Sequence, residues 1–371
     1  MTVRSVGVEE ELLLVAAETG QPLAVAESAL KAACQAGENG AEPEPRALEF
    51  ELQRQQLETA TKPCRLLSEL SEELRQGRAL AAAAAAEAGA RVAALATSPV
   101  QVKPDLVRKG RYLMMAQEYG HTAHEQLTCG CHVHVGIASP DEGVAVLDRI
   151  RPWLPVLLAL SANSPYWQGQ DSGYASFRYQ AWSRWPTAGP TDAFGTVETY
   201  RRTVREMVGT GTLLDSGMVY FDARLSEHYP TIEIRIADVC LYADDALLIA
   251  ALTRALAETE ARRWAAGSDA PGPRVEMLRL ASWRASRSGL EDMLVSPLSG
   301  QPEPAAAVAG ALFDHVRDAL DEAGDTDAAR ELLKALLARG NGAAFQRRTR
   351  LDRSLSYMID QAAEVTAQSG D

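Results

Sequence analysis

The most constraining feature of the sequence is the stretch 128–137, Thr-Cys-Gly-Cys-His-Val-His-Val-Gly-Ile, in which polar and apolar side chains alternate. In an extended strand, successive side chains point to opposite faces. His132 and His134 therefore share one face, and Cys131 and Val133 lie on the other. We expect a strand with one apolar face for a core and one face that carries two imidazoles.

The same stretch raises the alternative of a zinc site, because cysteine and histidine are the usual zinc ligands. Cys129 and Cys131 would share the face opposite His132 and His134. One strand cannot place all four side chains around a tetrahedral ion. We therefore expect the cysteines to pack as small apolar residues in the core.

Acidic residues mark a second expected strand, over 6–15. Glu9 and Glu11 share one face of it, and Glu10 lies on the otherwise apolar face. Two carboxylates on one strand face repel each other unless a cation lies between them. A solvated strand end is the alternative that the sequence leaves open.

A third acidic segment begins where residues 48–52 alternate, and residues 56–61 are the expected partner strand or its continuation. Glu58 follows Glu51 by seven positions. This odd spacing puts the two side chains on opposite faces of one straight strand. A turn or bulge must therefore intervene if both serve one site.

The segment 231–236 alternates most regularly, with Glu233 and Arg235 on one face and isoleucines on the other. A glutamate and an arginine two residues apart can simply pair with each other, which is one interpretation of this face. Residues 218–224 also alternate and predict a further strand, which ends at Arg224.

Residues 161–195 show little periodicity and are rich in aromatic side chains. A loop of this length in a compact domain is usually functional or disordered, and aromatic density argues against disorder. Arg178 and Arg184 are its cations, and a guanidinium group suits a carboxylate or a phosphate. A structural loop held by its aromatic side chains is the alternative.

Helical patterns occupy other parts of the chain, whereas residues 97–127 give no readable pattern. We expect helices over 25–36, 63–88, 139–160 (kinked by prolines), 243–266, 273–289, 304–323, 326–339 and 342–366. A Gly/Pro/Glu-rich loop is expected over 37–46. Strands dominate residues 1–240 and helices dominate 243–366, which indicates an α+β fold in a single domain over 1–371.

Composition excludes some classes of function. The net charge of −13 argues against a nucleic-acid partner. No apolar run reaches the roughly 18 residues of a transmembrane helix. The five cysteines lack regular spacing, which indicates reduced thiols in a cytoplasmic protein. No phosphate-binding loop of the G-x-x-x-x-G-K type occurs.

The expected strands bring many acids to one sheet. Five carboxylates and two imidazoles could share a site there only if metal ions neutralised them. Oxygen-rich ligation selects Mg²⁺ or Mn²⁺ over Zn²⁺. Several such ions and an arginine can bind a nucleoside triphosphate without a glycine-rich loop.

Four ordered motifs resemble the carboxylate–amine ligases known as glutamate–cysteine ligase type 2, which are related to glutamine synthetase. They are Gly7–Glu11, Cys129–Gly136, Leu160–Pro165 with Trp167, and Thr231–Arg235. The resemblance runs over nearly the whole chain and includes the segment Asp222–Ser226. It implies a curved, mostly antiparallel sheet that forms an active-site funnel, with helices packed on its outer face, and a homodimer.

The resemblance also implies roles for single residues. The metal ligands would be Glu9, Glu11, Glu51, Glu58, His132 and Glu233. Arg235 would hold the transferred phosphate, and His134 would either contact the nucleotide or only support its strand. Arg178, Arg184 and Arg224 are candidates for binding the substrate carboxylate.

The implied reaction has two steps, in which ATP phosphorylates the γ-carboxylate of glutamate and an amine then displaces phosphate to form an amide. Cysteine is the default amine, and Mg²⁺ or Mn²⁺ is the expected metal. The expected partners are therefore small molecules: an amino acid carboxylate, an amine and ATP. A phosphotransferase acting on guanidino or amine groups and a non-catalytic scaffold are the alternatives.

Overall fold

The computed structural model describes residues 3–38, 48–270 and 272–368. Its main sheet has the strand order β2-β3-β1-β5-β9-β8, and β4 pairs with the end of β1 on the edge opposite β3. Every strand pair in this sheet is antiparallel. The strands are β1 (Val6–Val15), β2 (Leu48–Glu49), β3 (Gln56–Ala60), β4 (Arg91–Ala93), β5 (Cys131–Gly136), β8 (Ala223–Leu225) and β9 (Thr231–Ile234).

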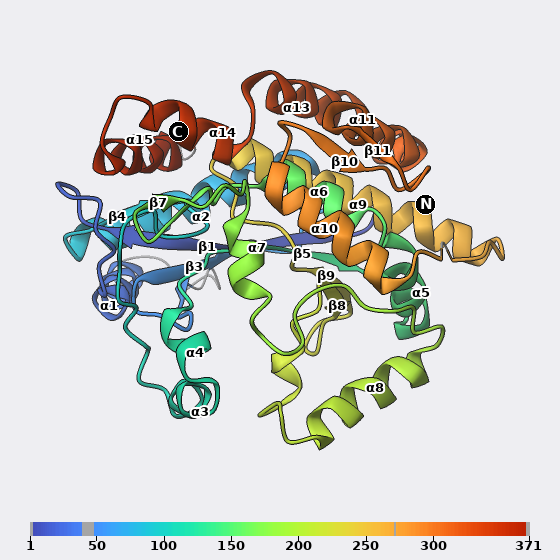
Figure 1. Ribbon diagram of the computed structural model, residues 1–371, viewed down its shortest axis with the longest axis horizontal. Coiled ribbons are helices and arrows are strands. Elements are labelled where there is room, and N and C mark those ends of the chain that lie inside the picture. Colours follow the sequence, from blue (N-terminus) through green and yellow to red (C-terminus); the bar gives the residue numbers. More distant parts are fainter. Residues whose placement is uncertain (1–2, 39–47, 271, 369–371) are drawn as a thin grey trace.

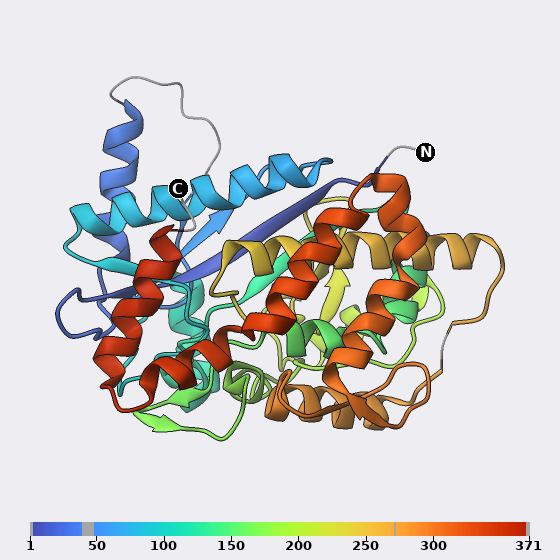
Figure 2. The same cartoon turned by 90° about the horizontal axis from the view of Figure 1, so that it is seen from above.

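Helices cover one face of the sheet (Figure 1). They include α2 (Leu67–Glu87), α6 (Leu154–Ser161), α9 (Ala243–Ala265), α10 (Val275–Ser288), α11 (Ala305–His315), α12 (Arg317–Ala323), α13 (Thr326–Arg339), α14 (Gly342–Arg350) and α15 (Leu355–Gln368). Seen from above, α2 runs alongside β1 (Figure 2), and α2 and α9 both contact β1 and each other. The expected α+β class, with an antiparallel sheet and helices on its outer face, is confirmed.

Smaller elements surround the sheet. In Figure 1, α3, α4 and α8 lie below it, and α7 descends between them. The remaining elements are α1 (Ala26–Glu38), α3 (Gly110–Tyr119), α4 (His121–Glu125), α5 (Pro140–Ile150), α7 (Phe177–Trp182), α8 (Val197–Gly209), the 3₁₀ turn η1 (Ser216–Met218), β6 (Tyr166–Trp167), β7 (Gln170–Asp171), β10 (Met293–Val295) and β11 (Pro302–Pro304). Within the described ranges, no helix is long and apolar enough to cross a membrane.

The main core lies between the sheet and α9. Val133 and Val135 of β5 and Ile232 and Ile234 of β9 are fully buried there, as their alternation predicts. Fully burying such side chains stabilises a fold by about 1.5–3 kcal/mol each. The opposite face of the same strands is left for the polar side chains.

Glu10, the acidic residue on the apolar face of β1, has a buried partner. The guanidinium group of Arg78 on α2 donates to both carboxylate oxygens of Glu10, at 2.9 and 2.6 Å. Arg78 also donates to the backbone oxygens of Leu241 and Cys240. The charge on the apolar face is therefore paired and hydrogen-bonded, which is what burial of a charge requires.

Some expected boundaries are wrong. The helix predicted from residue 63 begins at Leu67, because Cys64 still pairs with Val6 of β1 through two backbone hydrogen bonds of 2.8 Å. The strand expected over 218–224 is reduced to β8, since residues 216–218 form the 3₁₀ turn instead.

Other predicted elements end early or are interrupted. The strand expected over 48–52 stops at Glu49, and the predicted helices 304–323 and 342–366 are each divided in two. Residues 97–127 contain α3 and α4, which the sequence pattern did not indicate. The loop expected over 37–46 lies almost entirely outside the described residues.

Candidate active site

Strand register brings the histidines of β5 beside the acids of its two neighbours. His132 lies opposite Glu9 of β1, and His134 lies opposite Glu233 of β9. These side chains share the face that α9 does not cover, because their apolar neighbours point into the core. They line a cavity of about 270 Å³.

Glu11, Glu51 and Glu58 form an acidic group in the same cavity. Glu11 lies opposite Glu58 in the β1–β3 pair, and Glu51 stands in the turn between β2 and β3. This turn is the interruption that the odd spacing of Glu51 and Glu58 requires. One oxygen from each carboxylate lies within 4.8 Å of the others.

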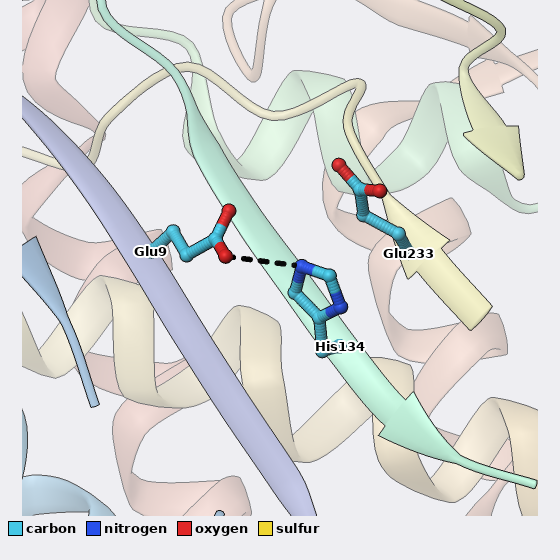
Figure 3. A group of neighbouring side chains, drawn as sticks. All are labelled: Glu9, His134 and Glu233. Carbon is cyan, nitrogen blue, oxygen red and sulfur yellow. Dashed lines mark ion pairs between the residues drawn. The ribbon is translucent and has the colours of Figure 1, made fainter. Parts of the chain in front are cut away.

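Glu9, His134 and Glu233 form a second group, with ligand atoms again within 4.8 Å of one another (Figure 3). Nε2 of His134 lies 3.4 Å from Oε1 of Glu9, and Nδ1 lies 3.0 Å from the hydroxyl of Thr231. When Nδ1 carries the proton and donates to Thr231, Nε2 keeps a lone pair for a cation.

His132 lies between the two groups. Its Nδ1 is 3.5 Å from Oε2 of Glu9 and its Nε2 is 3.8 Å from Oε1 of Glu11. Burial, followed by the nearby charge of Arg235, lowers the pKa of His132 to about 4. The ring is therefore neutral at pH 7, the form in which histidine binds a metal.

The acids of the cavity differ in their protonation. Burial and the charge of Glu51 raise the pKa of Glu11 to about 7, and the same two causes raise the pKa of Glu58 well above its ordinary value. Burial also opposes ionisation of Glu9, but hydrogen bonds with His132 and His134 outweigh it and lower the pKa.

The donor set of the cavity fits divalent cations. Glu11, Glu51 and Glu58 offer only oxygen and repel one another, so a cation between them would relieve the repulsion. Oxygen donors with one imidazole suit Mg²⁺ or Mn²⁺. Within the described residues, neither group with ligand-forming atoms this close contains a cysteine, so the zinc alternative finds no support.

Two arginines hold Glu233. Nε of Arg224 donates to Oε2 of Glu233 at 2.7 Å, and Arg235 donates to Oε1. The guanidinium of Arg235 also lies over the ring of Tyr220, 5.8 Å from its centroid. Because two cations share one carboxylate, this corner of the cavity carries positive charge that suits a phosphate.

The three arginines expected to bind substrate take different positions, and only Arg224 is among the residues that line the cavity. Arg178 is 2% exposed, lies 3.8 Å from Asp238, and donates to the backbone oxygen of Arg235. Arg184 donates to Glu125 near the surface, at 2.8 Å.

Several lining residues were given no role in the site from the sequence. They are Arg111, Tyr112 and Met115 of α3, Trp182 and Trp185 in and after α7, and Tyr220 after η1. Arg111 is held by both oxygens of Asp215, each at 2.9 Å, although the two residues are 104 positions apart. The aromatic density of 161–195 was the sequence signal for this side of the cavity, and it covers only Trp182 and Trp185.

A second cavity, of about 470 Å³, adjoins the first. The two share Arg224, Ser226, Glu227 and Tyr229 in their linings. The remainder of the second lining is mainly apolar and includes Ile137, Pro140, Tyr200, Val204, Val219, Leu225 and Pro230. A charged cavity thus continues into a more apolar one.

The fold matches solved ligase structures. A glutamate–cysteine ligase of Francisella tularensis, solved in complex with AMP, aligns with a TM-score of 0.71 at 12% identity over 100% of this chain and 90% of its own. A bifunctional glutathione synthetase of Pasteurella multocida gives 0.71 at 16% identity over 99% of this chain, which spans only 53% of that protein. At these identities the likeness shows that this chain has the fold of these solved ligases.

The family follows from sequence comparison. Residues 5–364 match the model of glutamate–cysteine ligase family 2. A Streptomyces avermitilis protein provisionally named glutamate–cysteine ligase 2-1 is 54% identical over 93% of this chain and 94% of its own. A Paenarthrobacter aurescens protein with the same provisional name is 50% identical over 100% and 97%. The chain belongs to glutamate–cysteine ligase family 2, as the sequence motifs indicated.

Proposed function

We propose that the protein joins the γ-carboxylate of glutamate to an amine through an acyl phosphate, with ATP as co-substrate, and that cysteine is the first amine to test. The supporting observation is the convergence of two acidic groups and two arginines in one cavity. The same proposal includes a homodimer in the cytoplasm, and sedimentation equilibrium tests the dimer.

The proposed reaction has two bond exchanges. A γ-carboxylate oxygen of glutamate attacks the terminal phosphorus of ATP, and ADP leaves with the electrons of the broken P–O bond. The amine nitrogen then attacks the acyl carbon, phosphate leaves with the electrons of the C–O bond, and the nitrogen loses a proton to solvent.

The acidic groups would hold divalent cations. Glu11, Glu51 and Glu58 would hold one, and Glu9 and Glu233 with His132 or His134 would hold another. A bound cation would neutralise the triphosphate and polarise its oxygens.

Arg235 and Arg224 supply the positive charge that the protein itself contributes. Arg235 is largely buried and its Nε makes no hydrogen bond within the described ranges, so its guanidinium is not saturated by Glu233. A preorganised cation in a buried site stabilises charge on a phosphoryl group more strongly than one in water. The adjoining apolar cavity would take the base of ATP, since Arg224 stands between the two cavities.

The experiment measures product formation. The protein, ATP and Mg²⁺ are mixed with glutamate and hydroxylamine, a small nucleophile that needs no binding pocket and traps an acyl phosphate as a hydroxamate. Hydroxamate and phosphate that both require glutamate would support ligation. Formation of ADP and a stable phosphorylated amine, without free phosphate, would instead support the phosphotransferase alternative, and absence of ATP binding in calorimetry would support the scaffold.

A further inference from the structure

The turn between β8 and β9 carries an exposed tyrosine where the two cavities meet. Tyr229 is among the residues that line both of them. The backbone of this turn is held in place, because Thr231 donates to the backbone oxygen of Tyr229 at 2.8 Å, and Ile137, just after β5, donates to that of Pro230 at 3.0 Å. The hairpin therefore fixes where the tyrosine stands relative to the cavities.

The ring of Tyr229 is largely uncovered. The residue is 64% exposed, and its ring contact within the described residues is with His134, at 6.3 Å between the ring centroids and an interplanar angle of 89°. An edge-to-face contact of this kind covers at most one face of the phenol ring. At least one flat face is therefore open to a ligand, and covering it would remove apolar surface from water.

Tyr200 of α8 is the other aromatic residue on the described lining of the second cavity, and its contacts are already made. It is 7% exposed, and its hydroxyl accepts a hydrogen bond from the backbone of Leu225 at 3.2 Å. Its ring packs against Phe194 with edge-to-face geometry and centroids 4.9 Å apart. Tyr229 is thus the ring on this lining with a face to offer.

The surroundings of Tyr229 change from charged to apolar. It contacts His134, which belongs to the group formed with Glu9 and Glu233 (Figure 3), and it also lines the cavity that contains Val204 and Leu225. A nucleoside triphosphate has the same order, since charged phosphates are joined to a flat base, and bases stack on aromatic side chains. Phosphates held at the charged groups would bring the base to the exposed ring.

We propose that the base of ATP stacks on the ring of Tyr229, while the acidic groups with their cations and the two arginines bind the phosphates. The inference rests on the proposed use of ATP and goes beyond it by assigning the contact of the base. It concerns binding alone, so no bond forms or breaks at this residue. Removing an aromatic ring on which a base stacks weakens binding by about fivefold to a hundredfold.

Calorimetry with two ligands separates the base from the phosphates. The ligands are the non-hydrolysable β,γ-imido analogue of ATP and inorganic triphosphate, each with Mg²⁺. Tyr229→Ala should raise the Kd of the analogue about tenfold or more, and Tyr229→Phe, which keeps the ring, should stay within about twofold of the parent. Inorganic triphosphate has no base, so its Kd should be the same in all three proteins.

A matched variant controls for the loss of an exposed ring. Tyr357 of α15 is 42% exposed and lines neither cavity, so Tyr357→Ala should leave the Kd of both ligands unchanged. Melting curves verify that every variant folds. An unchanged Kd of the analogue in Tyr229→Ala overturns the stacking. An equal loss for the analogue and for triphosphate also overturns it, because such a loss would arise from a shift of His134 and not from the base.

The hydroxylamine assay separates this inference from the proposed ligation. If the parent forms hydroxamate while Tyr229→Ala binds the analogue as tightly as the parent does, the ligation stands and the base contact is wrong. If binding of the analogue depends on the ring as expected but no hydroxamate forms, the base contact stands and the ligation is wrong. A parent that does not bind the analogue overturns both.

Discussion

At the residue scale, Glu233 is the side chain on which the contacts of the site converge. It accepts hydrogen bonds from Arg224 and Arg235 and lies opposite His134 of the neighbouring strand β5. Burial by itself would raise the pKa of Glu233, but the charges of Arg235 and Arg224 outweigh it and hold the pKa below its ordinary value. The carboxylate is therefore ionised at neutral pH and can balance cationic partners.

The first prediction is that Glu233→Gln abolishes turnover and leaves the fold. Glutamine keeps the shape of the side chain but removes the charge that orders Arg224 and Arg235, and we expect kcat to fall at least about a hundredfold. Hydroxamate formation measures the loss, and circular dichroism with a melting curve measures the fold. Glu198→Gln, on the exposed surface of α8, is the control. Turnover near the parent value in Glu233→Gln contradicts the site assignment.

Asp222 supports a prediction on pH. Burial raises its pKa to about 7, despite a hydrogen bond from the hydroxyl of Tyr179 and the nearby charge of Arg178, both of which lower it. The unfolded value is about 3.9, so the folded state holds this proton more tightly. The stabilisation is fully present below about pH 4 and is lost as the pH rises toward 7, by up to about 4 kcal/mol.

Asp222→Asn should flatten this dependence. The amide keeps the shape and cannot ionise, so the variant should gain stability relative to the parent as the pH rises from about 4 to about 7. Urea unfolding at several pH values measures the difference. Asp327→Asn, at an exposed position of α13, should follow the parent curve. A constant offset between Asp222→Asn and the parent across this range would refute the pKa assignment.

At the element scale, β1 connects the site to the core. Its cavity face carries Glu9 and Glu11, and its opposite face binds α2 through Glu10 and Arg78. Arg78 also holds the backbone of Cys240 and Leu241, just before α9 begins. One side chain thus fixes a strand of the site against the two helices that cover it.

Arg78→Met should destabilise the protein by about 3–5 kcal/mol, because it leaves Glu10 charged and buried without a partner. The midpoint of urea unfolding measures this loss. The double variant Glu10→Gln with Arg78→Met should recover part of it, since no charge then remains buried. Arg330→Met removes an exposed ion pair of α13 and should cost under about 1 kcal/mol. A similar small cost at Arg78 would mean that the buried pair contributes little.

The sequence predicted correctly the strands whose alternation of polar and apolar residues can be read without knowing their neighbours. Alternation placed His132 and His134 on one face of β5 and located Glu233 on β9, because a period of two needs no knowledge of neighbours. The start of α2 was missed because residues 61–64 pair with β1, a contact that Pro63 and the leucine stripe do not reveal.

For the site as well, the sequence predicted what depends on strand faces and missed what depends on tertiary contacts. Its acids follow from strand faces and from the family resemblance, whereas Arg111 depends on Asp215, which reaches it through tertiary packing. Arg178 looked suited to a ligand, but Asp238 lies beside it and its guanidinium packs against Gly130, where a Cβ atom would collide with it. Composition alone does not distinguish these two environments of arginine.

At the scale of the whole molecule, folding concentrates negative charge. The chain carries a net charge of −13, and the fold brings Glu11, Glu51 and Glu58 within contact of one another. In the unfolded chain these acids are spread along the backbone and their repulsion is weak. Repulsion among these carboxylates therefore lowers the free energy of unfolding, and a divalent cation bound between them would remove this repulsion.

The last prediction concerns the effect of Mg²⁺ on stability. A cation that binds only the folded state stabilises it by about 2.7 kcal/mol at a concentration one hundred times its Kd, which raises the melting temperature by a few degrees. At about pH 8, above the pKa of Glu11, Mg²⁺ should raise the melting temperature and a chelator should reverse the gain. The double variant Glu51→Gln with Glu58→Gln should melt higher than the parent without metal and gain less from Mg²⁺, because the repulsion and the ligands are lost together. Glu303→Gln, on the surface strand β11, should behave as the parent in both conditions. A double variant that melts lower without metal, or that gains as much from Mg²⁺, would show that these carboxylates neither repel one another in the folded state nor hold the cation.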